Sequence, residues 1–310
     1  MRTTFVKTLT ALAEKDSRIM LLTGDLGFTV LENFRDTLPA QFLNAGVAEQ
    51  NMVAVAAGLA LSGRRVFVYS IIPFVTFRCL EHIRNDLCYH NLRVCVVGVG
   101  GGYSYGHMGS THHALEDIAV MRSLAQMTVV CPGDPLETEA AVRAIAAHNG
   151  PCYLRLGKAG EPSLHKLPLS FTLGEAIPMR EGTDCTVIAT GNMLETAVNV
   201  TDVLTEQGIR ARLLSMHTVK PLDRDAILRA ARETPLIITI EEHSSIGGLG
   251  SAVAECLSLE QCRVPHLLLS APDHFAETVG SQKYLRAHCG LEPTAITLRI
   301  TQALSQTASR

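Results

Sequence analysis

The feature that most constrains the fold is a regular alternation of short apolar runs with longer segments of helical periodicity. Apolar strands that are joined through helices are typical of a parallel sheet covered on both faces. In the first half of the chain, the predicted strands are 19–23, 42–47, 65–70, 93–99, 128–131 and 152–156. The predicted helices between them are 49–62, 77–88, 114–124 and 135–148.

The alternation stops between Gly157 and Pro178, where prolines stand at 162, 168 and 178, and it resumes at Cys185. We therefore predict an α/β protein of two domains, 1–165 and 183–310, each with a mostly parallel sheet covered by helices. Residues 166–182 are the predicted linker. The strands predicted in the second domain are 185–189, 212–216, 236–240 and 266–269, and the helices are 194–206, 223–232 and 250–257.

Composition excludes several classes of function. The formal charge of −3 does not favour a nucleic-acid partner, and no apolar run reaches the ~20 residues that a membrane helix needs. Residues 1–15 resemble an amphipathic helix rather than a signal peptide, so we expect a cytoplasmic protein. The nine cysteines include no C-x-x-C pair, which indicates buried thiols and no metal site.

One acidic residue stands at a junction between a predicted strand and a predicted helix. Glu49 falls in the first turn of the helix, where its charge complements the helix dipole. Its neighbours Val47, Ala48, Met52 and Val53 are apolar, and such surroundings favour a carboxyl group that holds or shares a proton. Glu49 is therefore either a helix-starting acid or a catalytic one.

Three histidines fall in one loop that follows a predicted strand: His107, His112 and His113. Loops at the carboxyl ends of parallel strands are where open α/β sheets place ligands. No cysteine or H-E-x-x-H pattern accompanies these histidines, so contact with a substrate is a better reading than metal binding. Hydrogen bonds that stabilise the loop are the remaining reading.

The chain resembles the transketolase family, and it is also similar to deoxyxylulose-phosphate synthases. The likeness covers nearly the whole sequence, with the motifs in the family's order. The matching segments are Gly24-Asp-Leu26, Asn44-Ala-Gly-Val-Ala-Glu-Gln-Asn-Met52, Ala56-Ala-Gly-Leu59, Cys79-Leu-Glu-His-Ile-Arg84, Gly109-Ser-Thr-His-His113, Leu115-Glu-Asp-Ile118, Pro132-Gly-Asp-Pro135, Tyr153-Leu-Arg-Leu156, Val219-Lys-Pro-Leu-Asp223, Glu241-Glu-His243 and Gly247-Gly-Leu-Gly250. The resemblance implies a pyrimidine-binding domain, then a transketolase C-terminal domain.

The resemblance implies thiamine diphosphate as cofactor. In that family the glutamate at the position of Glu49 contacts N1′ of the aminopyrimidine and shares the proton that activates the cofactor. An aromatic residue stacks on the same ring. Phe74 is the first candidate and Phe77 the second, and a count back from Arg84 instead places Val75 there. Asp25 belongs to the motif that follows the first strand.

The resemblance also implies substrate contacts. His112 matches a histidine that touches substrate oxygens and passes protons, and His107 and His113 flank it in the same loop. Arg155 is a candidate for a substrate phosphate. The family's acidic residues before the G-x-T-H glycine are replaced by His107 and Met108, and Gly100 stands where a phosphate-binding histidine is common. These departures imply an unusual sugar or sugar phosphate.

The family's G-D-G motif, which binds the diphosphate and Mg²⁺, is absent, because Gly24-Asp25 continues with Leu26 and Gly133-Asp134 with Pro135. We therefore expect a split transketolase that transfers a ketol unit between sugars and is active only with an N-terminal diphosphate-binding subunit, as an α₂β₂ heterotetramer. That subunit would hold Mg²⁺, and this chain no metal. The alternatives are the β subunit of a 2-oxo-acid dehydrogenase and a non-catalytic paralogue.

Overall fold

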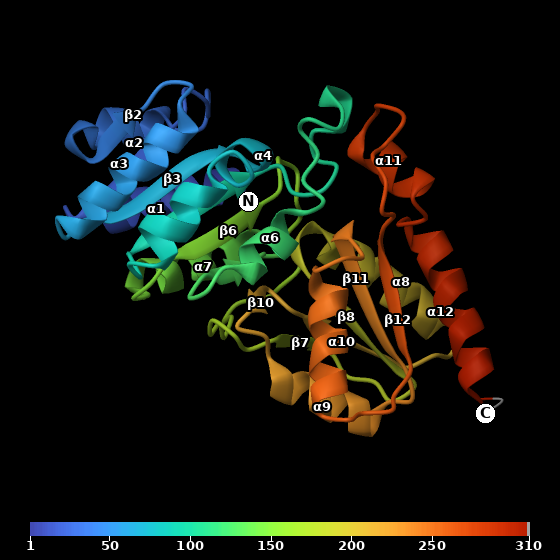
Figure 1. Ribbon diagram of the computed structural model, residues 1–310. Helices are drawn as coiled ribbons and strands as arrows, with labels where there is room; N and C mark the ends of the chain where they lie inside the picture. The colour runs from blue at the N-terminus through green and yellow to red at the C-terminus, as the bar shows by residue number, and fades with distance from the viewer. Residues whose placement is uncertain (309–310) are drawn as a thin grey trace.

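The computed structural model describes residues 1–308 and has two α/β domains, coloured blue to green and yellow to red in Figure 1. The first sheet has the strand order β10-β5-β6-β4-β3-β1-β2. All neighbouring strands in it are parallel except β10, which pairs antiparallel with β5. Its strands are β1 (Ile19–Thr23), β2 (Phe42–Asn44), β3 (Arg65–Ile71), β4 (Val94–Val99), β5 (Thr128–Val130), β6 (Cys152–Leu156) and β10 (Thr218–Lys220).

Two apolar clusters bury the faces of this sheet. Phe5 and Leu9 of α1 lie with Val142 of α7 in one cluster, and Met52 of α3 lies with Ile118 of α6 in the other. The sequence therefore folds as a layer of strands between two layers of helices. The helices are α1 (Arg2–Ala13), α2 (Glu32–Thr37), α3 (Glu49–Leu61), α4 (Ile72–Val75), α5 (Leu80–His82), α6 (Asp117–Ser123) and α7 (Pro135–Ala147), with short turns η1 (Pro39–Gln41), η2 (Ile83–Cys88) and η3 (Gly106–Met108).

The second sheet has the order β12-β11-β8-β9-β7, and only β7 runs antiparallel. Helices α8 and α12 pack together over one face, and α9 and α10 over the other (Figure 1). The strands are β7 (Ile177–Arg180), β8 (Cys185–Ala189), β9 (Ala211–Ser215), β11 (Ile237–Ser244) and β12 (His266–Ala271). The helices are η4 (Gly191–Met193), α8 (Leu194–Glu206), α9 (Arg224–Glu233), α10 (Leu249–Leu259), α11 (Gln282–His288) and α12 (Pro293–Ala308).

The predicted fold class, two mostly parallel sheets covered by helices, is confirmed. Two short edge strands were not predicted. Strand β7 lies inside the segment 166–182, which was expected to be only a linker, and β10 comes from the second half of the chain yet extends the first sheet. The two halves of the sequence therefore share a sheet edge, and the domains are joined by more than the linker.

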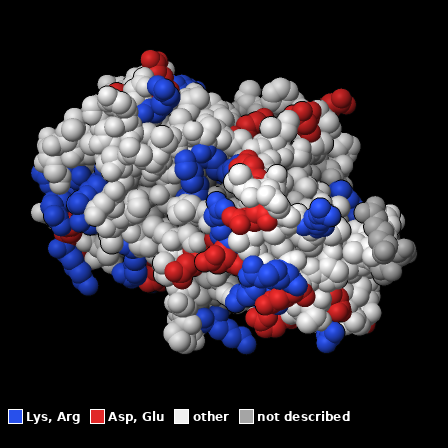
Figure 2. Space-filling model, turned by 60° about the horizontal axis from the view of Figure 1, so that its bottom comes forward, with Lys and Arg blue, Asp and Glu red and all other residues white. Residues whose placement is uncertain are grey.

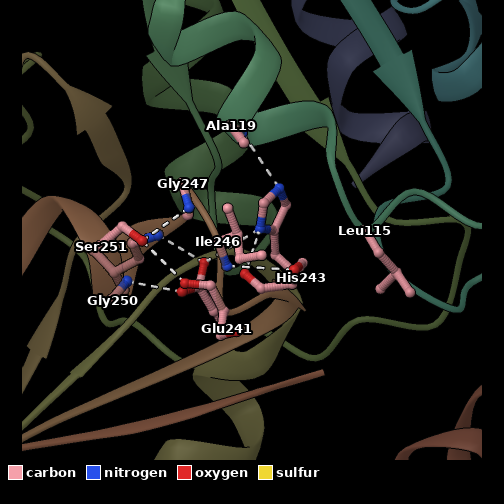
Figure 3. Close-up of polar contacts among 12 residues, drawn as sticks. Leu115, Ala119, Glu241, His243, Ile246, Gly247, Gly250 and Ser251 are labelled. Atoms are coloured by element: carbon pink, nitrogen blue, oxygen red, sulfur yellow. Dashed lines mark hydrogen bonds and ion pairs between the residues drawn. The ribbon is translucent and has the colours of Figure 1, made fainter. Parts of the chain in front are cut away.

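A buried polar network joins strand β11 to helix α10 and to helix α6 of the first domain (Figure 3). The Glu241 carboxylate accepts hydrogen bonds from Leu249 N and Gly250 N, each 2.7 Å long, at the start of α10. Burial raises the pKa of Glu241 to about 7. A Cβ atom at Gly248 would lie 2.1 Å from Glu241 Oε2, so this approach requires glycine.

His243 carries the same network into the first domain. Its Nε2 accepts a hydrogen bond of 3.3 Å from Ala119 N of α6 (Figure 3). Ser244 N donates to Leu115 O at 2.7 Å. Burial lowers the pKa of His243 to about 4, with a smaller contribution from Arg155 in the same direction and an opposing one from Asp117. The imidazole is therefore neutral in the folded protein.

The face shown in Figure 2 carries Lys and Arg side chains next to Asp and Glu side chains over its lower part. Ion pairs of the second domain include Arg212 with Glu233 and Arg224 with Glu260. Mixed charge of this kind differs from the uniformly basic surface that a nucleic-acid backbone attracts. Within residues 1–308, none of the helices combines the length and the apolar character needed to span a bilayer.

We predict that replacing His243 with Gln costs stability at pH 7.5 and that this cost shrinks by about 1–2 kcal/mol at pH 5. The unfolded histidine takes up a proton below pH 6.5 while the folded one stays neutral down to about 4, so the wild type loses stability as the pH falls. Glu241 has a raised pKa in the folded state, so it increases stability as the pH falls. This effect is present in the wild type and in His243→Gln alike and cancels in the comparison. Urea denaturation at the two pH values measures the difference. The exposed His90→Gln variant is the control, and an equal cost for His243→Gln at both pH values contradicts the account.

Candidate active site

The candidate site lies where β1, β2 and β3 end and α3 begins. Glu49 starts α3, and its side chain is 2% exposed. Ser70 Oγ, near the end of β3, donates to Glu49 Oε1 at 3.3 Å, and Arg78 Nη1 donates to Glu49 Oε2 at 2.7 Å. A Cβ atom at Gly24 would lie 3.3 Å from Glu49 Cγ, so the end of β1 lies directly against this side chain.

Tertiary structure gives Glu49 a partner that its apolar sequence neighbours did not indicate. Chain folding brings the guanidinium of Arg78 to 2.7 Å from the Glu49 carboxylate. In the free chain Glu49 is therefore half of an ion pair, with a partner 29 residues away in sequence that local pattern did not reveal.

An aromatic group lies beside this ion pair. The Cζ atom of Arg78 is 4.8 Å from the centroid of the Phe74 ring, and the His112 ring meets Phe74 edge-on at 5.1 Å between centroids. His112 is also 6.3 Å from the ring of Tyr105. The structure thus brings together Glu49, Phe74 and His112, three residues that the sequence predicted from separate segments.

The other two candidates for the stacking position differ from Phe74. Val75 is fully buried in the core of the first domain. Phe77 is 37% exposed and is followed by the short α5 and the π-helical turn η2, where one continuous helix over 77–88 was predicted.

Asp25 lies at the mouth of the same region. Asp25 N donates to Asn44 Oδ1 at 3.0 Å, and Asn44 Nδ2 donates to Asp25 Oδ1 at 2.9 Å, which joins the ends of β1 and β2. The backbone of Asp25 has a φ of 56°, an uncommon conformation for a residue other than glycine. The side chain is exposed and available to a ligand.

The remaining histidines of the loop lie differently from His112. His107 is exposed on η3. His113 is buried with its Nε2 3.4 Å from Gly106 O and its ring edge-on to Tyr103, a residue of the second domain's core. Burial lowers the pKa of His113. Its position supports the reading of a histidine that stabilises the loop.

The expectation that Arg155 contacts a substrate phosphate does not hold in this structure. Its side chain is 3% exposed, and its guanidinium donates to Asp117 at 2.8 and 3.2 Å and to the carbonyl oxygens of Ala114 and Glu242. Tyr153 adds a hydrogen bond of 2.6 Å to Asp117. Arg155 therefore joins the two domains. The residue type alone does not indicate which partners an arginine will have.

Three residues near the site were not predicted. Arg78 contacts Glu49 and Phe74, Tyr105 lies beside His112, and Lys158 Nζ lies 5.0 Å from the Tyr105 ring centroid. The sequence contains an indication for two of them. Tyr105 lies in the same glycine-rich loop as the histidines, and Lys158 stands just after the end of strand β6. Nothing in the sequence links Arg78 to Glu49.

These residues fit a planar heteroaromatic ring. Phe74 offers an aromatic face, and the buried Glu49 offers an oxygen acceptor beside it. Within residues 1–308, no group of three or more His, Cys, Asp or Glu side chains is arranged to hold a metal ion. Two large apolar side chains, Phe28 and Val47, are exposed in the segments that carry Asp25 and Glu49.

Comparison with known families decides the identity of this fold. The family described as transketolase, pyrimidine binding domain, matches residues 1–160, and that described as transketolase, C-terminal domain, matches residues 174–296. The chain belongs to the transketolase family. The resemblance noted from the sequence motifs is thereby confirmed.

Relatives in the transketolase family match the chain over almost its full length. A subunit of the apulose-4-phosphate transketolase of Phocaeicola vulgatus is 42% identical over 299 residues, which cover 95% of this chain and 94% of that protein. The 6-deoxy-6-sulfo-D-fructose transketolase subunit SqwH of Clostridium sp. (strain MSTE9) is 40% identical, covering 94% and 90%. These relatives do not favour the alternatives of a 2-oxo-acid dehydrogenase β subunit or a non-catalytic paralogue.

Solved structures agree with this placement. A structure described as a split gene transketolase, inactive beta4 tetramer, superposes with a TM-score of 0.91 and 36% identity, covering 98% of each chain. The transketolase of Campylobacter jejuni shares the fold, with a TM-score of 0.81 and 16% identity, and this chain spans 46% of it. The 1-deoxy-D-xylulose-5-phosphate synthase of Syntrophotalea carbinolica is 35% identical over 94% of this chain and 46% of its own length.

We predict that Asp117→Leu lowers the free energy of unfolding by about 3–5 kcal/mol, because it leaves the buried Arg155 charge without its partner. Adding Arg155→Met to this variant removes the unpaired charge and restores part of the loss. Urea denaturation measures both variants. Glu139→Gln, which breaks an exposed ion pair with Arg143, should change stability by less than about 0.5 kcal/mol. A double variant no more stable than Asp117→Leu contradicts this assignment.

Proposed function

We propose that this chain is the subunit of a split transketolase that binds the aminopyrimidine of thiamine diphosphate, and that Glu49 activates the cofactor there. The observation that carries the proposal is the buried Glu49 carboxylate beside the Phe74 ring, with His112 edge-on to the same ring. Membership of the transketolase family supports thiamine diphosphate as the ring's source.

Each residue of the half-site has a proposed part in the reaction. Thiamine diphosphate, when bound, supplies the nucleophilic carbon and the electron sink for breaking a C–C bond beside a ketone. Phe74 orients the aminopyrimidine by stacking, with Phe77 as the second candidate, and Glu49 shares a proton with ring atom N1′. Asp25 borders the site from the end of β1.

His112 is the residue proposed to handle the substrate. Its Nδ1 lies 3.0 Å from Thr111 Oγ1, and the side chain is half-buried. A histidine so placed donates a hydrogen bond to a substrate oxygen or moves a proton there. His107 is proposed to contact the substrate from the outer, exposed end of the loop. His113 is proposed to support substrate binding indirectly, by holding that loop in position.

The other half of the site is proposed to come from a partner subunit that binds the diphosphate and Mg²⁺. The exposed Phe28 and Val47, 72% and 76% accessible beside Glu49 and Asp25, support a protein surface covering this edge. Two relatives named as transketolase subunits and a solved structure named as a split gene transketolase support the same arrangement. We propose an α₂β₂ heterotetramer.

We also propose a cytoplasmic location. All nine cysteines are free thiols and seven of them are buried. Cys95 and Cys152 stand opposite each other on neighbouring strands without forming a bridge. Free thiols in such number suit a reducing compartment.

The substrate is proposed to be an unusual ketose or ketose phosphate. His107 and Met108 stand where many transketolases carry acids, and Gly100 stands where a phosphate-binding histidine is common. Two relatives bear the names of apulose-4-phosphate and 6-deoxy-6-sulfo-D-fructose transketolases, which supports a ketose outside the ordinary pentose phosphates. Lys158, next to Tyr105, is a candidate cation for an anionic substrate group.

We predict that Glu49→Gln lowers kcat of the complex with the diphosphate-binding subunit by at least about 10²-fold. The amide still reaches the pyrimidine ring but does not share a proton with it, so the complex still binds thiamine diphosphate. The measurement is ketol transfer under saturating cofactor, with cofactor binding followed by calorimetry. Glu206→Gln, at the exposed end of α8, is the matched control and should keep full activity.

Two outcomes would contradict the proposed function. One is normal turnover by the Glu49→Gln complex, which removes Glu49 from the chemistry. The other is turnover by this chain without any partner, which removes the need for a second half-site.

A further inference from the structure

The guanidinium of Arg78 makes two contacts at once in the candidate site. It donates to Glu49 Oε2 at 2.7 Å, and its Cζ lies over the Phe74 ring at 4.8 Å from the centroid. One planar group therefore covers the aromatic face and engages the buried carboxylate. These are the same two contacts that the aminopyrimidine is proposed to make.

A guanidinium and an aminopyrimidine have similar recognition chemistry. Each is planar and stacks on an aromatic face. The guanidinium donates N–H groups to a carboxylate, and a pyrimidine ring nitrogen shares a proton with a carboxyl group. Glu49 has two oxygens, and Ser70 already donates to Oε1 while Arg78 donates to Oε2. A ring that stacked on this face of Phe74 and reached Oε2 would overlap the guanidinium.

We propose that Arg78 is a resident occupant of the pyrimidine half-site that sets cofactor affinity and withdraws when the ring enters. This inference rests on the proposed function, because it takes Glu49 and Phe74 as the ring's contacts. It assigns Arg78 as a residue that opposes cofactor binding, rather than as a residue that assists it.

The geometry allows Arg78 to leave by a movement of the side chain alone. Its side chain is 45% exposed whereas that of Glu49 is 2% exposed, so the guanidinium reaches the carboxylate from the solvent side. The backbone around it is held: Gln50 Nε2 donates to Arg78 O at 3.0 Å, and the buried Cys79 donates from Sγ to Phe74 O at 3.3 Å.

The contact also explains how the chain tolerates Glu49 before the cofactor binds. A buried carboxylate without a partner is costly, and an arginine from the solvent side satisfies it. When the arginine leaves, the incoming ring takes its place as the partner of Glu49. Arg78 thus supplies the buried carboxylate with a partner until the ring binds.

The test is cofactor binding by the complex with the diphosphate-binding subunit, measured by calorimetry with thiamine diphosphate and Mg²⁺. If Arg78 fills the half-site about nine-tenths of the time, Arg78→Met lowers the apparent Kd about tenfold. Arg143→Met, which removes an exposed arginine paired with Glu139, should leave Kd unchanged. An unchanged or higher Kd for Arg78→Met overturns the proposal, the higher value making Arg78 a residue that assists binding.

The same titration separates this inference from the proposed function. A wild-type complex that binds no thiamine diphosphate refutes both. Normal binding by the wild type together with no gain from Arg78→Met refutes only the role of Arg78.

A second measurement needs no cofactor. In the chain alone, Arg78→Met should lower the thermal unfolding midpoint, because it leaves Glu49 buried and unpaired. Combining it with Glu49→Gln should recover the loss. Equal midpoints for the wild type and Arg78→Met would show that the ion pair is not formed and would overturn the proposal.

Discussion

A single buried carboxylate organises the site, and its position follows from the sheet. Glu49 begins α3 at the carboxyl ends of β1 and β3, where Gly24 is small enough to lie against it and Ser70 donates to it. Because Glu49 is buried, it must have a hydrogen-bonding partner in every state of the protein. In the free chain that partner is Arg78, and in the proposed enzyme it is a ring nitrogen of the cofactor.

The second domain acts on this site through the loop that carries His112. Arg155 and Asp117 form a buried ion pair at the junction, and the carbonyl oxygen of Glu242 in β11 accepts from Arg155. Glu242 in turn accepts from the backbone of Tyr103 near the start of the loop. The domain junction is therefore the support that fixes where the loop can present its histidine.

Sequence alone predicted most of the fold because buried parallel strands are continuous apolar runs, as in 94–99 and 185–189. It missed β7 and β10, three or four residues long, because edge pairing of such short segments depends on tertiary neighbours rather than on local pattern. In the site it predicted Glu49, Phe74 and His112. It misplaced Arg155 and missed Arg78, because an arginine's partner is fixed only when distant segments meet.

The central claim is that Glu49 meets the aminopyrimidine of thiamine diphosphate. It is tested most directly by an experimental structure of this chain with its diphosphate-binding partner, the cofactor and Mg²⁺. The account predicts Glu49 within about 3 Å of the ring nitrogen N1′, a hydrogen-bonding distance, with the ring on Phe74. A structure in which the ring lies elsewhere, or in which Glu49 stays paired with Arg78 while the cofactor is bound, would contradict it.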